Sequence, residues 1–395
     1  MTFGGFADYY QKDVPGVFSS VSDPTLQAEF RTANEAAIRA MRDMDKWLDS
    51  QRPHATEAFV MGADLFSRML KETELVDVSL DELERVGRAD LERNVEALRQ
   101  ACAEYAPGKT ILECINKASA MKPDGGTVEA ARRQLDELKA FVAERQIVTI
   151  PGPEQARVME SPPYQRYNFA YIDIPGPYEK GLPSIYYVAP PDPSWSKAEQ
   201  LAYIPGRSDL LFTSVHEVWP GHFLQFLHSN ANPDKLEALW VGYAFAEGWA
   251  HYCEEMMIEM GLGKGDSEKH IGQISEALLR DVRLLSAIGL HTHGMTVAQS
   301  EKMFREQAFQ DPGNARQQAA RGTYDPAYLN YTLGKLMIRK LRADWLAKGA
   351  AADSKAPAAE TLGRWHEFHD KFLSYGGPPI PLLRKELLGE DGSLL

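Results

Sequence analysis

Two histidines and a glutamate lie close together in the segment DLLFTSVHEVWPGHFLQFLHSN, residues 209–230. His216 and Glu217 follow an apolar run, and His222 comes six residues after His216. In the zinc-binding pattern H-E-x-x-H, histidines four residues apart share one helix face and bind one ion, while the glutamate activates water. A spacing of six turns the second ring about 240° around a regular helix. On an unbroken helix the two rings would therefore point apart.

The residues between the histidines predict a break in that helix. Pro220 lacks an N–H, and its ring clashes with the carbonyl four residues back, at His216. Gly221 tolerates backbone angles that other residues avoid. Together they predict a broken or widened turn, which could bring His222 back toward His216. Both rings could then reach one zinc ion.

A third ligand is expected from the next helical segment, YAFAEGWAHYCEEMMIEMG. Glu247 follows apolar residues on this helix, where an unpaired carboxylate would be costly to bury. A zinc ion would compensate the charge, so we expect Glu247 to be a ligand. His251 and Glu254 lie on the same face four and seven residues later. His251 is a rival ligand or an outer partner, and Glu254 could hold the other nitrogen of a histidine.

These residues together predict zinc-dependent hydrolysis of an amide bond. Three protein ligands (His216, His222 and Glu247) leave one position for water, whose pKa zinc lowers toward about 7. Glu217 is the expected general base, which takes the proton of that water and later delivers it to the leaving amine. One Zn²⁺ per chain is expected, although other divalent metals also suit such ligands.

The motifs resemble those of the bacterial family called domain of unknown function 885 (DUF 885), whose members are regarded as zinc metallopeptidases of the gluzincin type. The family pattern is close to H-E-x-x-P-G-H-H-x-x-Q followed by E-G-W-A-L-Y. The chain departs from it at Phe223, usually a second histidine, and at His251, usually leucine. The positions it keeps are His216, Glu217, Pro220, Gly221, His222, Gln225, Glu247, Gly248, Trp249 and Tyr252.

Further similarity extends from about residue 40 to the end of the chain. RDVRLLSAIGLHTHGMT resembles a family segment through Arg283, Gly289 and His291, and RGTYDPAYLNYTLGK resembles another through Arg321 and Tyr331. The resemblance implies that His291 and Tyr331 donate hydrogen bonds to the charge that develops on the scissile carbonyl. It implies that Arg321 anchors a substrate carboxylate. All three are expected to converge near Glu217.

Two other functions fit the same residues. The substrate could be a non-peptide amide or ester of a metabolite rather than a peptide, because the chemistry of zinc-bound water is the same. A non-catalytic metal-binding protein is also conceivable, but the presence of Glu217 argues against it, since its clearest use is acid–base chemistry. The segments FAYIDI and SIYYVA could supply an edge strand for an extended peptide, or they could simply cover the core.

The elements that must position these residues are mainly helices. Apolar residues at three- and four-residue spacing predict helices over 24–50, 55–71, 78–105 and 126–145, and again over 208–229 and 236–260. Short alternating runs bounded by Pro and Gly predict a small sheet within 146–206. The expected fold is mainly α with a minor β sheet. Three regions follow: an N-terminal helical region (1–145), the small sheet (146–206) and a helical catalytic region (207–395), the last two forming one unit.

The amino-acid composition limits the classes of partner that the protein is expected to bind. The chain has 43 Lys and Arg against 56 Asp and Glu, and a net charge of -13 repels phosphate backbones, so nucleic acid is not expected. Three cysteines without C-x-x-C spacing predict no disulfide framework. No stretch approaches 18 apolar residues, and the N-terminus shows no signal-peptide pattern. We therefore expect a cytoplasmic enzyme without membrane contact that acts on a peptide or small amide.

Overall fold

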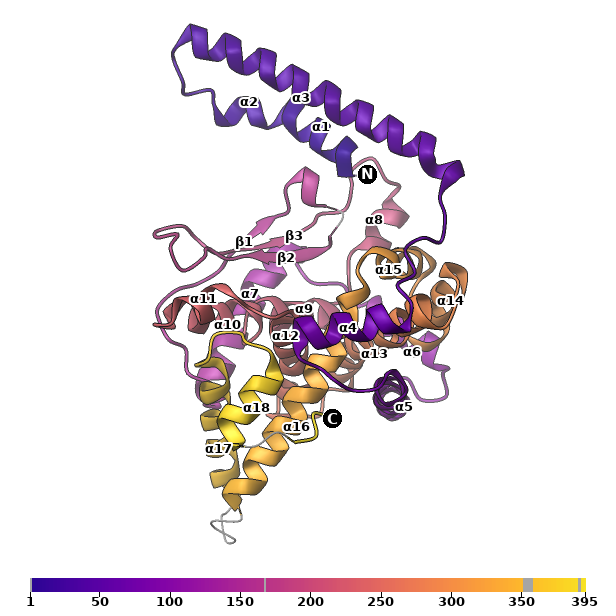
Figure 1. Ribbon diagram of the computed structural model, residues 1–395, viewed down its shortest axis with the longest axis vertical. Helices are drawn as coiled ribbons and strands as arrows, with labels where there is room; N and C mark the ends of the chain where they lie inside the picture. The colour runs from indigo at the N-terminus through magenta and orange to yellow at the C-terminus, as the bar shows by residue number, and fades with distance from the viewer. Residues whose placement is uncertain (1, 167, 351–357, 390–391) are drawn as a thin grey trace.

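An arm of helices forms the N-terminal end of the protein, which was analysed as a computed structural model. The structure describes residues 2–166, 168–350, 358–389 and 392–395. Figure 1 shows the arm at the top, where α1 (Thr2–Lys12) runs antiparallel to α3 (Pro24–Gln51), with α2 (Val14–Val17) between them. The Asp23 carboxylate caps α3 by accepting from the backbone of Thr25 and Leu26. No residue of α3 is buried.

The next helices confirm most of the periodicity. They follow a short 3-10 turn, η1 (Arg52–His54), and are α4 (Ala63–Glu74), α5 (Leu80–Tyr105), α6 (Ile111–Ser119) and α7 (Thr127–Glu144). Ser79 caps α5 by accepting from the backbone N–H of Glu82, as the spacing predicts. The helix expected over 55–71 begins later, at Ala63. Gly62, with φ of 79°, holds a conformation that a helix cannot continue through.

One disulfide, Cys102–Cys114, corrects the expectation from the cysteine count. Cys102 lies in the last turn of α5 and Cys114 in the first turns of α6, and the short connection between these helices places both buried side chains together. Sequence spacing cannot show this pairing, because it depends on how the two helices fold back on each other. Cys253 is free and buried.

The small sheet has three strands and separates the arm from the helical body (Figure 1). Strand β3 (Ile185–Val188) is central, with β1 (Arg157–Glu160) parallel on one side and β2 (Ala170–Asp173) antiparallel on the other. Helix α7 packs against β1. The 3-10 turn η2 (Pro163–Gln165) contacts α1 through Tyr164, which packs against Phe6 and Tyr9. The predicted minor sheet is therefore confirmed.

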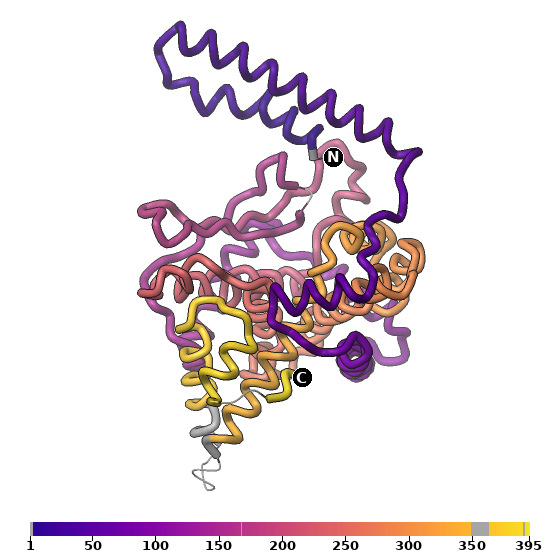
Figure 2. The backbone as a smooth tube through the Cα atoms, in the orientation of Figure 1, coloured from indigo at the N-terminus to yellow at the C-terminus, as the bar shows by residue number. Residues whose placement is uncertain are grey.

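The helical body contains the core and continues to the C-terminal end (Figure 2). Its central helix, α13 (Ser267–Thr292), is buried at every residue from Ala277 to His291 and packs against α5 and α9. The other elements of this part are α8 (Lys197–Tyr203), α9 (Arg207–Glu217), α10 (His222–Ala231), α11 (Lys235–Leu239), α12 (Tyr243–Glu259), α14 (Val297–Gln307), α15 (Pro312–Tyr324), η3 (Pro326–Leu329), α16 (Asn330–Ala350), α17 (Ala358–Leu373) and α18 (Ile380–Leu388).

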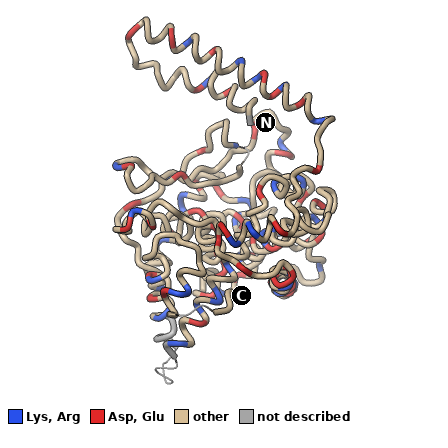
Figure 3. The backbone as a smooth tube through the Cα atoms, in the orientation of Figure 1, with Lys and Arg blue, Asp and Glu red and all other residues tan. Residues whose placement is uncertain are grey.

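The surface bears both signs of charge. Figure 3 shows acidic and basic residues interspersed along the helices rather than gathered by sign. Among the described helices, none is long and apolar enough to cross a membrane. The fold is thus the mainly helical one with a minor sheet that the sequence predicts.

Candidate metal centre

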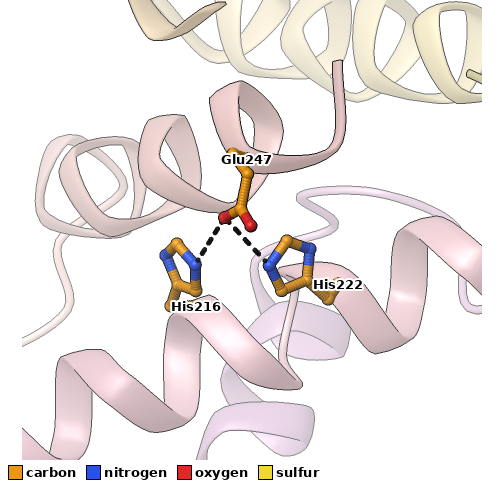
Figure 4. Close-up of side chains that lie close together, drawn as sticks. All are labelled: His216, His222 and Glu247. Carbon is orange, nitrogen blue, oxygen red and sulfur yellow. Dashed lines mark hydrogen bonds and ion pairs between the residues drawn. The ribbon is translucent and has the colours of Figure 1, made fainter. Parts of the chain in front are cut away.

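Three side chains from three helices meet at one point. His216 lies in the last turn of α9, His222 begins α10 and Glu247 lies in α12. One side-chain nitrogen or oxygen atom from each falls within 4.8 Å of the others. Figure 4 shows both imidazoles turned toward the carboxylate. Nε2 of His216 lies 3.2 Å, and Nε2 of His222 3.3 Å, from the same Oε2 atom of Glu247. Two imidazoles and one carboxylate converging in this way are a zinc-type donor set.

A break between α9 and α10 brings the two histidines together. Helix α9 ends at Glu217, a cis Trp219–Pro220 peptide follows, and α10 starts at His222. A Cβ atom on Gly221 would lie 1.8 Å from the carbonyl oxygen of His216, so only glycine fits there. The deviation that the Pro-Gly pair predicts is confirmed. Because of this break, the rings of His216 and His222 point toward the same carboxylate although they are six residues apart.

Helix α9 is fixed from several sides. Its first residue, Arg207, forms two 2.7 Å hydrogen bonds with Glu268 of α13. Further along, the Ser214 hydroxyl donates to Gln134 of α7 at 3.0 Å and lies 3.4 Å from the hydroxyl of Tyr186 in β3. These contacts hold α9 against the core and the sheet. His216 therefore sits on a rigid element, as a precise site requires.

Helix α12 packs closely against its neighbours through one indole hydrogen bond and a contact between two glycines. The indole N–H of Trp249 donates to the carbonyl of Pro220 at 2.9 Å, which ties α12 to the break. On the other side, a Cβ on Gly248 would lie 2.5 Å from Cα of Gly334 in α16. The two glycines let α12 and α16 approach closely. Glu247 and Tyr331 are thereby brought to the same region.

The second nitrogen of His216 has its own partner. Nδ1 of His216 lies 2.7 Å from Oε1 of Glu254, as the sequence suggests for a histidine ligand. The other carboxylate oxygen of Glu254 pairs with Nδ1 of His251 at 3.1 Å, and Arg280 approaches Glu254 at 3.5 Å. His251 is not part of the three-residue cluster. It therefore lies behind Glu254, outside this cluster.

The charged groups at the centre shift one another's pKa values. Burial alone raises the pKa of Glu247, but the charge of His222 and hydrogen bonds from both histidines hold it well below its usual range. Burial lowers the pKa of His216, yet hydrogen bonds with Glu247 and Glu254 raise it to about 9. The carboxylates thus favour a positive charge between them. A divalent cation satisfies the same demand, so the residues fit a metal ion.

Glu217 borders the cluster without belonging to it. It is half-buried, and its carboxylate forms no hydrogen bond or ion pair with the described residues. Burial raises its pKa, and the nearby charges of His222 and His216 oppose that shift. A raised pKa is the usual property of a carboxylate that accepts and returns a proton near neutral pH.

Tyr331 and Arg321 lie beside the cluster, whereas His291 does not contact it. The Tyr331 ring stacks on His216 with centroids 6.0 Å apart, and Arg321 reaches the Tyr331 hydroxyl at 3.5 Å. Arg321 also donates to the Tyr243 hydroxyl at 2.9 Å. Burial raises the pKa of Tyr331, so its hydroxyl stays protonated and can donate. Tyr243, which also packs against Tyr331, belongs to this group although no motif indicates it. Its position one helical turn before Glu247 is the signal in the sequence that could have identified it.

His291 is placed elsewhere than the sequence predicts. Its Nε2 donates to the carbonyl of Gly322 at 2.8 Å, and its ring packs against Phe59 and Phe66. The residue is buried and makes these contacts instead of contacting His216, His222 or Glu247. A motif position on a buried helix does not fix the direction of a side chain. We therefore assign His291 a packing role.

A family described as "Bacterial protein of unknown function (DUF885)" matches residues 2–387. The chain belongs to this family. The resemblance that the motifs predict is thus confirmed, and the match begins at residue 2 rather than near residue 40. The family description assigns no activity, and no functionally curated protein matches the chain.

Two solved structures share the fold of this DUF885 chain. One, from Shewanella oneidensis, is described as a "putative lipoprotein of unknown function" and has a TM-score of 0.74 at 24% identity, covering 97% of this chain and 69% of that one. The other, a "putative lipoprotein" from Colwellia psychrerythraea, has a TM-score of 0.80 at 19% identity, covering 98% and 67%. At these identities the likeness concerns the fold alone.

Proposed function

We propose that this protein is a zinc-dependent hydrolase that cleaves an amide bond, with a peptide as the expected substrate. The observation that carries the proposal is the convergence of His216, His222 and Glu247, with ligand atoms within 4.8 Å of one another. Three such ligands are typical of catalytic zinc, whereas structural zinc usually has four protein ligands.

The residues around the cluster supply the remaining roles. A zinc ion held by His216, His222 and Glu247 would supply a Lewis acid and a water of lowered pKa. The Glu217 carboxylate accepts a proton from the attacking water and returns it to the leaving amine, a role that its raised pKa supports. The Tyr331 hydroxyl donates to the carbonyl oxygen as negative charge develops there. Glu254 holds Nδ1 of His216 and so orients this ligand.

The small sheet favours a peptide substrate over a small metabolite, because it has an edge strand. Strand β2 (Ala170–Asp173) lies at its edge and pairs only with β3 among the described strands. An edge strand offers backbone donors and acceptors to an extended chain. Hydrolysis of a small non-peptide amide or ester is the alternative, since the chemistry at the metal is the same.

The test compares the native protein with Glu217→Gln. Both are stripped with a chelator, reloaded with zinc, checked for one zinc per chain and incubated with a mixed peptide pool analysed by mass spectrometry. We expect cleavage by the native protein and a loss of about 10²–10⁴-fold in the variant, with its zinc retained. Full cleavage by metal-free native protein would reject the proposal. His293→Ala, an exposed histidine outside the cluster, is the matched control.

The compartment is part of the proposal. A disulfide such as Cys102–Cys114 persists mainly in oxidising compartments. It therefore favours a location outside the cytoplasm over the cytoplasmic one that the sequence suggests, and the description of both structural neighbours as lipoproteins agrees with this. A nucleic-acid partner is not proposed, because the net charge is -13.

A further inference from the structure

One arginine near the candidate metal centre has no acidic partner. Arg283 lies on the central helix α13 and is only 6% exposed. Its Nε donates to Oε1 of Gln318 at 2.8 Å, but no carboxylate among the described residues forms an ion pair with it. Its neighbours differ: Arg280 pairs with Glu254 and Glu276, and Arg321 pairs with Asp325 at 2.8 Å.

The lone charge is unusual for such a buried position. Burial and the nearby charge of Arg321 lower the pKa of Arg283 to about 10, which still leaves it charged at neutral pH. A buried charge without a counter-ion is costly, and proteins normally pair it. The guanidinium of Arg283 therefore lacks a negatively charged counter-ion among the described residues. A bound anion would supply that counter-ion.

The position of Arg283 connects it to the metal ligands. Its guanidinium carbon lies 4.7 Å from the centre of the Tyr331 ring, and that ring lies 6.0 Å from the ring of His216. The guanidinium of Arg321 lies 5.6 Å from the same tyrosine ring. The distance from Arg283 to the Tyr331 ring and the distance from that ring to the His216 ring together equal the length of about three residues of extended peptide. Each extended residue spans about 3.3–3.6 Å.

We propose that Arg283, assisted by Arg321, binds a carboxylate of the substrate within about three residues of the bond that is cleaved. The inference rests on the proposed hydrolase function and narrows it to substrates with a free carboxylate near the scissile amide. Such a carboxylate belongs either to the C-terminus of a peptide or to an acidic side chain.

A carboxylate fits the site better than a phosphate. Arg283 leaves one positive charge to balance, and a carboxylate carries one negative charge, whereas a phosphate monoester carries close to two. Glu217 and Glu247 lie at the same centre and disfavour further negative charge. The planar guanidinium can also hold both oxygens of a carboxylate at once.

The experiment measures binding and cleavage with three matched peptides. They are acetyl-trialanine as the free acid, the same peptide as the C-terminal amide, and acetyl-Ala-Ala-Glu amide, whose only carboxylate is a side chain. Binding is measured by calorimetry in a Glu217→Gln background, which prevents turnover. Cleavage is measured with the zinc-loaded native protein.

We expect at least one carboxylate-bearing peptide to bind about 30-fold more tightly than the trialanine amide, which corresponds to about 2 kcal/mol. Preference for the free acid alone assigns the C-terminal carboxylate, and preference for the glutamate peptide assigns a side chain. The proposal is overturned if all three peptides bind equally or none binds.

Three variants test whether Arg283 is responsible. Arg283→Gln should reduce the 30-fold preference to below about 3-fold, and Arg283→Lys should restore part of it. Arg305→Gln, which removes the same charge from the exposed surface of α14, should leave the preference unchanged. A preference that survives in Arg283→Gln rejects the assignment.

The melting temperature separates binding from a structural role. Arg283→Gln removes an unpaired buried charge, so its Tm should be equal to or higher than that of the native protein. A purely structural arginine would instead lose stability on substitution. A large fall in Tm would therefore count against the proposal, and the comparison of acid and amide peptides on the native protein needs no variant at all.

The outcomes also separate this inference from the proposed function. If no peptide is cleaved with any metal, yet binding depends on the carboxylate and on Arg283, the anion site stands and the hydrolase proposal fails. If free acid, amide and glutamate peptides are all cleaved and bound alike, the hydrolase stands and the anion site fails.

Discussion

Nδ1 of His216 lies 2.7 Å from Oε1 of Glu254, an acid with no exposed surface. This contact fixes the ring of His216 and leaves its Nε2 directed at Glu247, 3.2 Å away. Because a metal ligand must present an unprotonated nitrogen, a carboxylate on the opposite nitrogen favours the binding-competent tautomer. Glu254 thus orients His216 without belonging to the three-residue cluster.

Replacing Glu254 by glutamine should weaken zinc binding. Glutamine keeps the volume but removes the charge that holds the proton on Nδ1 of His216, and loss of such a partner costs about 10–100-fold in affinity. Competition with a chromophoric zinc chelator measures the effect. Glu306→Gln, on the exposed face of α14, is the control. Unchanged zinc affinity in Glu254→Gln would mean that the contact is only structural.

Gly221→Ala should disrupt the break between α9 and α10. The new Cβ would lie 1.8 Å from the carbonyl oxygen of His216, and that atom belongs to backbone that cannot move away cheaply. We expect a loss of about 3 kcal/mol or more in the free energy of unfolding, together with lower zinc content. Chemical denaturation and metal analysis measure the two effects. Gly16→Ala meets no atom within 4 Å and should change neither.

Tyr331→Phe should slow the proposed reaction without affecting the metal. The change removes a hydroxyl that stays protonated because burial raises its pKa, and it leaves the ring that stacks on His216. Loss of one donor to the developing charge is worth about 10²–10³ in kcat. Steady-state kinetics with a cleaved peptide, alongside zinc analysis, measures this. A variant with native kcat would remove Tyr331 from the mechanism and leave it a packing residue.

The convergence of His216, His222 and Glu247 can be predicted from the sequence because it depends on local rules. Pro220 and Gly221 are read directly from the chain, and the break they cause explains how histidines six residues apart face one carboxylate. The contact of Glu254 with His216 also agrees with helical spacing, since Glu254 shares a face with Glu247. These features need only the geometry of one helix and its end.

Features that depend on three-dimensional pairing escape the sequence. Whether Arg283 meets an acid is decided by helices distant in the chain, so its unpaired charge becomes visible only in the structure. The Cys102–Cys114 bond depends on how α6 folds back on α5. His291 matches a family position, yet its ring is held by the carbonyl of Gly322. In each case the partner, rather than the residue type, determines the outcome.

Glu74 should make the protein less stable as the pH rises. Its side chain is 2% exposed, and its Oε1 accepts from the backbone of Ala244 at 3.3 Å and from Asn330 at 3.3 Å, while its Oε2 has no partner among the described residues. Burial raises its pKa from 4.5 to about 7. The folded state therefore holds this proton more tightly than the unfolded chain, whose carboxyl keeps the ordinary pKa of 4.5.

The stability that Glu74 contributes is fully present below pH 4.5, where both states are protonated, and is lost as the pH rises to about 7. Glu74→Gln abolishes this titration, so the variant should exceed the native protein in unfolding free energy at pH 8 by up to about 3 kcal/mol, at 1.36 kcal/mol per pKa unit. At pH 5 the difference should be small. Urea unfolding at both pH values measures it, with Glu72→Gln as the exposed control. A gain that is the same at pH 5 and pH 8 would show that Glu74 does not titrate in this window.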